Sequence, residues 1–318
     1  MRYGLSLRIG TAAPPAEVLG RIAGLERAGL DSTWMGQLFG IDTLMLYATA
    51  GRDTTTISLG TAVVPTYSRH PLVLASQALT AQALTGDRIV LGIGSSHRAL
   101  VHDTMGIDYR RPAQYLREYL EVLRAALDGA PIDHVGEMLR VSTGAFGTTG
   151  VPGAGRVPVV VGTFSPKSLR AAAELADGVM TWLAGPRVLG TEVRPTIDDL
   201  AAAAGRSRPR LVAGLPIAVT DDPARERATV ARFLGPFVRF PAYQDVFRRE
   251  GIAGPAELAI VGGEQEVADR LGELAELGVT DFYGGCSSDD DATVDRTVEL
   301  LGDLARRRTT EEPGWPTA

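Results

Sequence analysis

Short apolar runs alternate with longer helical segments through most of this chain, and this alternation restricts the possible folds more than any other feature. The runs are rich in β-branched residues and apolar at successive positions, as expected of strands that are covered on both faces. Helical segments separate nearly all of them, and such crossovers join parallel strands. They include predicted helices at 71–85, 112–127, 166–176 and 223–234. Eight strands are predicted, over residues 5–9, 32–36, 57–64, 88–94, 157–162, 177–183, 211–219 and 279–285.

The number of strands favours a closed (β/α)₈ barrel over an open doubly wound sheet. Eight units of roughly 30 residues, with insertions, account for the length of the chain. The sequence therefore predicts an α/β protein with a single TIM-barrel domain over 1–308. Insertions are expected before the fifth strand (about 129–156, with a hairpin at 134–141) and around the seventh (about 184–260), and a loose tail over 309–318.

Composition and charge exclude several classes of function. No apolar run approaches the roughly 20 residues that cross a bilayer. A net charge of −6 and a pI near 5.4 argue against binding to nucleic acid or to an anionic membrane. The single cysteine, Cys286, excludes an intramolecular disulfide and a cysteine-rich metal site, and no HExxH pattern is present. The first residues lack the features of a secretory signal, so a cytoplasmic protein without a bound metal is expected.

In a TIM barrel, functional residues lie at the carboxyl ends of the strands and in the loops that follow. After the predicted fifth strand, the segment GTFSPKS brings Gly162, Thr163, Ser165 and Lys167 to the start of a helix. Backbone N–H groups at such a start attract anions, and Lys167, the one lysine of the sequence, adds a positive charge. The pattern fits a phosphate site and a capped helix beside a solvated lysine equally well.

Two of the four histidines lie close to predicted strand ends. His97 ends the segment GIGSSH after the fourth strand, and its ordinary pKa near 6.5 suits proton transfer. A structural role in that loop is the alternative. GIGSSH is not a dinucleotide fingerprint, because His97 stands where the third glycine would be and no helix follows at once. His70 precedes Pro71 at a predicted helix start, where it either supports the helix or lines the pocket.

Several segments together resemble the luciferase-like monooxygenase superfamily, and within it the actinobacterial oxidoreductases that depend on coenzyme F420, a deazaflavin. They are DSTWMGQLFGIDTL, LGTAVVPTYSRHP, DRIVLGIGSSHR, RRPAQYLREYL, VPVVVGTFSPKSLRAAAELADGVMTW and RPRLVAGLPIAVTDD, in the order of the family. The resemblance implies a barrel that binds a flavin-type ring at its mouth, with a cis peptide bond at Ala62–Val63 against the ring. It also implies a set of cofactor-binding residues, namely Ala62, Val63, Gly94, Ser95, Ser96, Gly162, Thr163, Ser165 and Lys167.

The chain departs from the sugar-phosphate dehydrogenases of this superfamily. Gln37 and Leu38 stand where those enzymes carry an Asp–His pair, and His97 stands at the position of their glutamate. Glucose 6-phosphate oxidation is therefore not expected. Instead, we predict that His97 gives a proton to the substrate or takes one from it, with Gln37 and His70 orienting it.

These observations predict an F420-dependent oxidoreductase that transfers a hydride between the coenzyme and a small organic substrate. Reduction of an unsaturated carbonyl or imine is favoured over alcohol oxidation. A two-component, FMN-dependent monooxygenase on the same fold is the alternative, and a non-catalytic flavin-binding protein is a third class. Relatives pair through outer helices, and the apolar helical segment LMLYATA (44–50) therefore suggests a homodimer.

Overall fold

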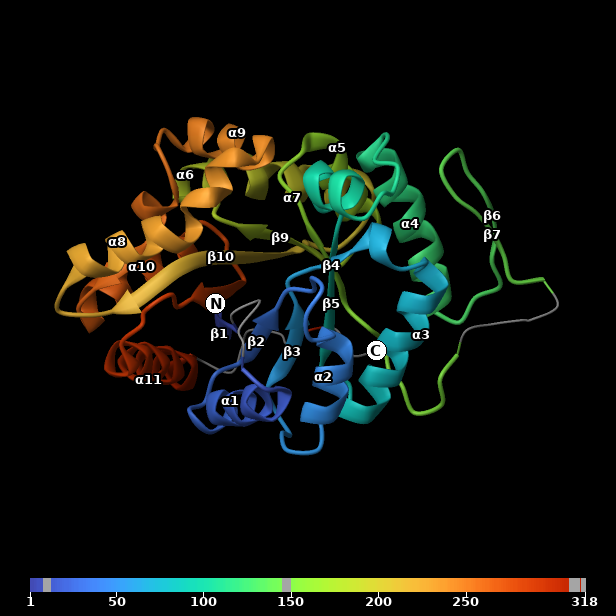
Figure 1. Ribbon diagram of the computed structural model, residues 1–318. Coiled ribbons are helices and arrows are strands. Elements are labelled where there is room, and N and C mark those ends of the chain that lie inside the picture. Colours follow the sequence, from blue (N-terminus) through green and yellow to red (C-terminus); the bar gives the residue numbers. More distant parts are fainter. Residues whose placement is uncertain (8–12, 145–149, 309–314, 316–318) are drawn as a thin grey trace.

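The computed structural model describes residues 1–7, 13–144, 150–308 and 315, and a closed ring of eight parallel strands forms its centre (Figure 1). Each of these strands hydrogen-bonds to two neighbours, and the pairing of β9 with β10 closes the ring. The predicted TIM barrel is confirmed. In ring order the strands are β1 (Arg2–Ser6), β2 (Ser32–Met35), β3 (Ser58–Thr61), β5 (Ile89–Gly94), β8 (Val159–Gly162), β9 (Gly178–Trp182), β10 (Arg210–Val219) and β12 (Asp281–Gly285).

Helices cover the outside of the ring (Figure 1), and local capping explains where many of them begin. The side chains of Asp42, Ser165 and Asp290 each accept a hydrogen bond from the first turn of a helix. None of the described helices is long and apolar enough to cross a membrane. The helices that follow the barrel strands are α1 (Pro15–Arg27), α2 (Thr43–Ala50), α3 (Pro71–Thr85), α4 (Pro112–Leu127), α5 (Pro166–Leu175), α6 (Pro186–Val188), η4 (Leu189–Val193), α7 (Arg194–Ala203), α10 (Glu264–Glu276) and α11 (Asp291–Arg307).

Two further segments extend the barrel. β6 (Asp133–Val135) and β7 (Arg140–Ser142) form the predicted hairpin, which projects beyond α4 (Figure 1). Between β10 and α10, the chain forms a segment that we call the β10–α10 insertion. It consists of α8 (Pro223–Leu234), η5 (Gly235–Arg239), α9 (Pro241–Glu250), η6 (Pro255–Leu258) and β11 (Ile260–Gly262). Because β11 pairs with the end of β10, the insertion is tied to the barrel.

Most strand ends lie within one or two residues of their predicted positions, but two strands differ by three residues at one end. The predicted strand 57–64 is interrupted, since β3 ends at Thr61 and β4 (Val64–Pro65) pairs with β5 only after a bulge. The first strand begins at Arg2, where the prediction placed it at residue 5. A charged residue does not indicate a strand by hydropathy, but the Arg2 guanidinium donates to Ser58 Oγ (3.2 Å) and so finds a polar partner. Residues 8 and 9 of the predicted strand lie outside the described residues.

Three aromatic rings fill much of the barrel interior, and glycines make room for them. The Tyr283 ring lies between those of Trp34 and Trp182, with centroid distances of 5.6 Å to Trp34 and 5.7 Å to Trp182. A Cβ atom at Gly60 would lie 2.2 Å from the Trp34 ring, and one at Gly214 would lie 2.2 Å from the Tyr283 ring. Both positions therefore require glycine. Val90, Val160, Met180 and Val212 complete this cluster.

Trp315, in the C-terminal tail, also packs in this interior cluster. Its side chain is buried, and the Arg210 guanidinium lies 4.6 Å from the centroid of its ring. Because Arg210 is the first residue of β10, the indole lies at the amino end of the barrel. The predicted loose tail is therefore wrong at Trp315, while 309–314 and 316–318 lie outside the described residues.

Truncating the Trp315 side chain is expected to destabilise the barrel. Replacing a buried tryptophan by alanine costs about 3 kcal/mol or more, so Trp315→Ala should lower the free energy of unfolding by that amount in guanidinium denaturation. Phe233→Ala is the control, because Phe233 on α8 is exposed, and its loss should stay below about 1 kcal/mol. If Trp315→Ala is as stable as the unchanged protein, the indole is not buried at the amino end of the barrel.

Candidate active site

The bulge after β3 lies at the carboxyl end of the barrel, between β2 and β5. Its Ala62–Val63 peptide bond is cis, which confirms the expectation from the family resemblance. The Ala62 N–H donates to the Met35 carbonyl (2.9 Å), and the Val63 carbonyl accepts from the Gln37 N–H (3.1 Å). The backbone that follows β2 therefore holds the bulge in place.

The Val63 side chain packs against two glycines of neighbouring strands. A Cβ atom at Gly94, the end of β5, or at Gly162, the end of β8, would lie 3.0 Å from a Val63 methyl carbon. Carbon atoms pack favourably only at about 3.5–4.0 Å, so Val63 fits because both positions are glycine. The structure thus brings four predicted cofactor residues together at the mouth: Ala62, Val63, Gly94 and Gly162.

The turn between β8 and α5 offers hydrogen-bond donors and a cation. Ser165 caps α5, since its Oγ accepts from the Ser168 N–H (3.3 Å) and donates to the Ser168 Oγ (2.9 Å). Thr163 Oγ1 accepts from the Ser165 N–H (3.1 Å), which leaves the Thr163 hydroxyl proton available. Lys167 is exposed, and no carboxylate pairs with it within the described ranges. This donor set suits an anion at the helix start.

Tyrosines support the loop after β5. Ser96 has a left-handed backbone (φ 59°), and its carbonyl accepts from the Tyr109 hydroxyl (3.0 Å). Tyr67 lies between Tyr109 and Tyr115, with ring centroids 5.2 and 4.3 Å away. Ser95 Oγ donates to a backbone carbonyl at the start of α4 (3.4 Å). Ser95 and Ser96, which are both predicted to line the cofactor, therefore lie on a loop that is held in place by α4 and by the segment after β4.

His97 follows Ser96 on this loop, and its ring lies against the β10–α10 insertion. Its ring stacks on Phe240, with 4.3 Å between centroids and 19° between planes, and Tyr243 lies 5.7 Å away. Burial lowers the pKa of His97 from its ordinary value of 6.5, because surroundings of low polarity disfavour the charged imidazolium. The ring is therefore mostly unprotonated at neutral pH.

The side chains of Gln37 and His70 make local contacts at helix starts. Gln37 Oε1 accepts from the Thr43 N–H at the start of α2, and Nε2 donates to its neighbour's carbonyl, both at 2.8 Å. His70 is exposed and its Nδ1 accepts from the Leu72 N–H (3.3 Å) at the start of α3. Across the described residues, no hydrogen bond joins either side chain to His97. Their orienting role stays a prediction.

Sequence analysis missed the aromatic residues around His97. Phe237, Phe240 and Tyr243 come from the β10–α10 insertion, and Phe164 of the β8–α5 turn packs edge-on against Tyr243 (5.7 Å). The regular spacing of aromatic residues in PFVRFPAYQDVF was the available signal. Nothing in that local pattern shows that the insertion folds back onto the loop after β5.

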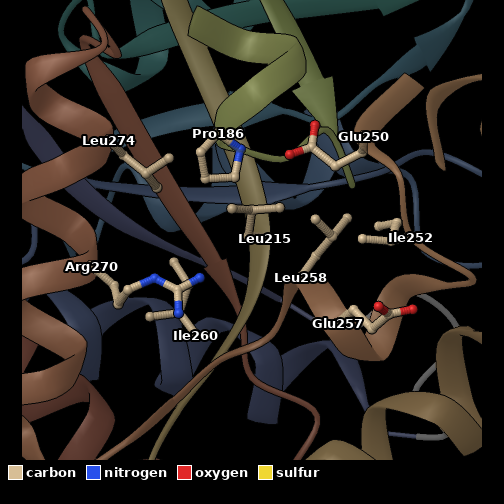
Figure 2. Close-up of a pocket in the computed structure, with 9 residues that line it drawn as sticks. All are labelled: Pro186, Leu215, Glu250, Ile252, Glu257, Leu258, Ile260, Arg270 and Leu274. Carbon is tan, nitrogen blue, oxygen red and sulfur yellow. The ribbon is translucent and has the colours of Figure 1, made fainter. Parts of the chain in front are cut away.

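A separate pocket of about 180 Å³ lies in the outer layer of the barrel (Figure 2). Successive side chains of a strand point to opposite faces. Val212 of β10 belongs to the interior cluster, so Leu215, an odd number of positions further along, points outward. Glu250 uses its carboxylate to accept from the N–H groups of Arg187 and Val188 (3.0 and 2.9 Å). No predicted site residue is among those that line the pocket: Pro186, Leu215, Glu250, Ile252, Glu257, Leu258, Ile260, Arg270 and Leu274.

A family model and several known proteins match most of this chain. Residues 1–281 match the model described as luciferase-like monooxygenase. A protein of Mycobacterium tuberculosis named as a coenzyme F420-dependent oxidoreductase is 29% identical over 271 residues, which cover 79% of this chain and 78% of that protein. The 5,10-methylenetetrahydromethanopterin reductase of Archaeoglobus fulgidus is 26% identical over 309 residues, or 87% and 91% of the two chains. An F420-dependent secondary alcohol dehydrogenase has the same fold, with a TM-score of 0.78, 17% identity, and coverage of 96% and 99%.

Adding a methyl group at Gly94 is expected to displace Val63. Gly94→Ala should lower the free energy of unfolding by about 1–3 kcal/mol, the usual cost of overpacking. Gly20→Ala in α1 is the matched control, because no atom lies within 4 Å of the added carbon, and it should stabilise the helix by about 0.5–1 kcal/mol. Urea denaturation of both variants measures the difference.

A second substitution tests whether Val63 is the cause. In the Gly94→Ala background, Val63→Ala removes the methyl groups that the new Cβ atom meets. The double variant should recover part of the lost stability. If the two losses simply add, Val63 does not pack on Gly94 as described.

Proposed function

The chain belongs to the luciferase-like monooxygenase family, and on this premise we propose that it is a coenzyme F420-dependent oxidoreductase. The observation that carries the proposal is the arrangement of the mouth, where the bulge at Ala62–Val63 and the Lys167 turn lie at the same end of the barrel. Two relatives that match more than three quarters of the chain support it: one is named as an F420-dependent oxidoreductase and the other as a 5,10-methylenetetrahydromethanopterin reductase.

The residues at the mouth fit a planar ring with a phosphate arm. The Lys167 ammonium, the Thr163 hydroxyl and the backbone N–H groups at the start of α5 are donors suited to a phosphate. Gly162 and Ser165 belong to the same turn and would hold that group with them. Ala62 and Val63 would back the ring, and Gly94, Ser95 and Ser96 would line it. When bound, the coenzyme supplies or accepts the hydride.

We assign the proton of the reaction to His97. Its ring is fixed by stacking, and it is the histidine that follows β5 at the mouth. The proposed substrate is a small organic molecule with an unsaturated carbonyl or imine group, to which the protonated imidazole gives a proton during reduction. The lowered pKa of His97 favours a second candidate, alcohol oxidation, in which the neutral imidazole accepts the proton.

We further propose that the protein is a cytoplasmic homodimer. Met45 on α2 and Val73 and Leu84 on α3 are large apolar side chains that are exposed, and α2 packs against α3. Val73 and Leu84 are eleven positions apart, about three helical turns, so they lie on one face of α3. A second copy of the chain would cover this apolar surface. The single cysteine suits a reducing compartment.

Titration with coenzyme F420 tests the proposed cofactor. The protein should bind oxidised F420, and Lys167→Gln should weaken binding about tenfold or more, because one charge-assisted hydrogen bond contributes about 1.5–3 kcal/mol. Arg170→Gln, one turn further along α5, is the matched control and should bind as the unchanged protein does. FMN is titrated in parallel. Binding of FMN alone would favour the monooxygenase alternative, and binding of neither would reject the proposal.

The pH dependence of turnover tests the role and direction of His97. For reduction, kcat/KM should fall as the pH rises through the pKa of His97, which lies below 6.5, because the imidazolium is the donor. For alcohol oxidation, kcat/KM should instead rise through the same pKa and level off. Initial rates between pH 5 and pH 8 are followed by the absorbance of the coenzyme. If kcat/KM of His97→Gln keeps the same pH dependence, another group exchanges the proton.

A further inference from the structure

His97 is fixed at two points that come from different parts of the fold. Its backbone carbonyl accepts from the N–H groups of Leu100 and Val101, both at 3.0 Å, where η2 (Ala99–Thr104) begins. Its ring stacks on Phe240, the residue before the first turn of α9. The loop after β5 therefore holds the backbone, and the β10–α10 insertion holds the ring.

The two aromatic residues that face His97 are held by further rings. Phe237 lies edge-on to Phe240 (6.0 Å between centroids) and to Tyr243 (4.9 Å). Phe164 contacts Tyr243 from the barrel side, and Tyr243 itself is buried. Edge-to-face contacts of this kind restrict the rotation of each ring. Four rings therefore form an aromatic wall beside His97: Phe240, Tyr243 and Phe237 of the insertion, and Phe164 of the turn that carries Lys167.

Stacking orients the imidazole without using its nitrogen atoms. The phenylalanine side chain has no hydrogen-bonding group, so the Phe240 ring stacks on the face of the imidazole without occupying either ring nitrogen. In the part of the chain that the structure describes, no hydrogen bond reaches either ring nitrogen of His97. A group that exchanges a proton with a substrate needs both a fixed orientation and a nitrogen that the protein does not occupy.

The described groups that face the His97 ring carry no charge at neutral pH. Phe240 cannot ionise, and burial raises the pKa of the Tyr243 phenol well above its ordinary value, so it stays protonated. Arg98, the next residue along the chain, is exposed and lies 3.4 Å from the His102 ring. Burial is the cause of the lowered pKa of His97. Removing the Phe240 ring would therefore admit water to the imidazole and restore its ordinary titration.

We propose that Phe240 and Tyr243 are positioning residues for His97, so that the β10–α10 insertion orients the imidazole and keeps water from it during proton exchange with the substrate. This inference rests on the proposed function, because it takes His97 as the group that exchanges the proton. It assigns to the insertion a part in the reaction, because both rings that face His97 belong to it.

The titration of His97 in the protein without cofactor tests the wall directly. The imidazole resonances of the four histidines are followed by NMR as the pH is lowered, and His97→Gln identifies the signal of His97. His97 should titrate below 6.5 in the unchanged protein. Phe240→Leu should move the midpoint up toward 6.5, whereas Phe240→Tyr, which keeps a ring for stacking, should leave it low. Phe233→Leu on α8 is the control outside the wall and should change nothing.

Turnover of the same variants tests whether the wall acts in the reaction. In Phe240→Leu the pH limb of kcat/KM should move by the same amount as the NMR midpoint, while the Kd for F420 should stay within about twofold. An unchanged NMR midpoint of His97 in Phe240→Leu would overturn the proposal. A midpoint that moves while the pH profile of kcat/KM stays the same would also overturn it. If the unchanged protein neither binds nor turns over F420, the proposed function fails, and the catalytic part of this proposal fails with it. The NMR midpoint distinguishes that case from a failure of the stacking.

Discussion

A ring of parallel strands closes only if side chains fill the space that it encloses. Eight strands leave an interior just wide enough for side chains, and in this protein Trp34, Tyr283 and Trp182 occupy much of it. Glycines next to these rings let the large side chains fit. Closure in turn brings the ends of β3, β5 and β8 to one rim. The loops that carry the candidate site are therefore neighbours only because the interior is filled.

The candidate site divides its tasks between the barrel and the insertion. Strand ends with small residues form the surface on which a flat ring can lie, because Val63 packs directly on Gly94 and Gly162. The first turn of α5 provides donors for an anion, and the cap at Ser165 makes that turn regular. His97, the proposed proton-exchanging residue, follows a barrel strand, and the rings that contact it come from the insertion. In the proposed function, the barrel holds the cofactor and the insertion shapes the surroundings of the imidazole.

Much of the fold could be predicted because its signals are local. The helices α3, α4 and α8 begin and end where predicted, since a proline opens each of them and the apolar spacing continues to the last turn. The errors occur where a distant contact overrides the local pattern. Arg2 belongs to a strand because Ser58 and Asp281 lie nearby in space, and the strand after Ser58 breaks because the backbone after β2 holds the bulge. Trp315 belongs to a segment predicted as a loose tail, but its indole is buried in the interior cluster.

The sequence by itself determined the order of strands and helices, the TIM barrel and the position of the helix start that carries Lys167. These depend on periodicity and turn chemistry within a few residues. Only the tertiary structure decided that Val63 packs on Gly94 and Gly162 and that Phe240 covers His97. Those contacts join residues far apart in the chain, and whether two such surfaces fit depends on the shapes and directions of side chains after the barrel has closed. Local patterns of hydropathy do not contain that information.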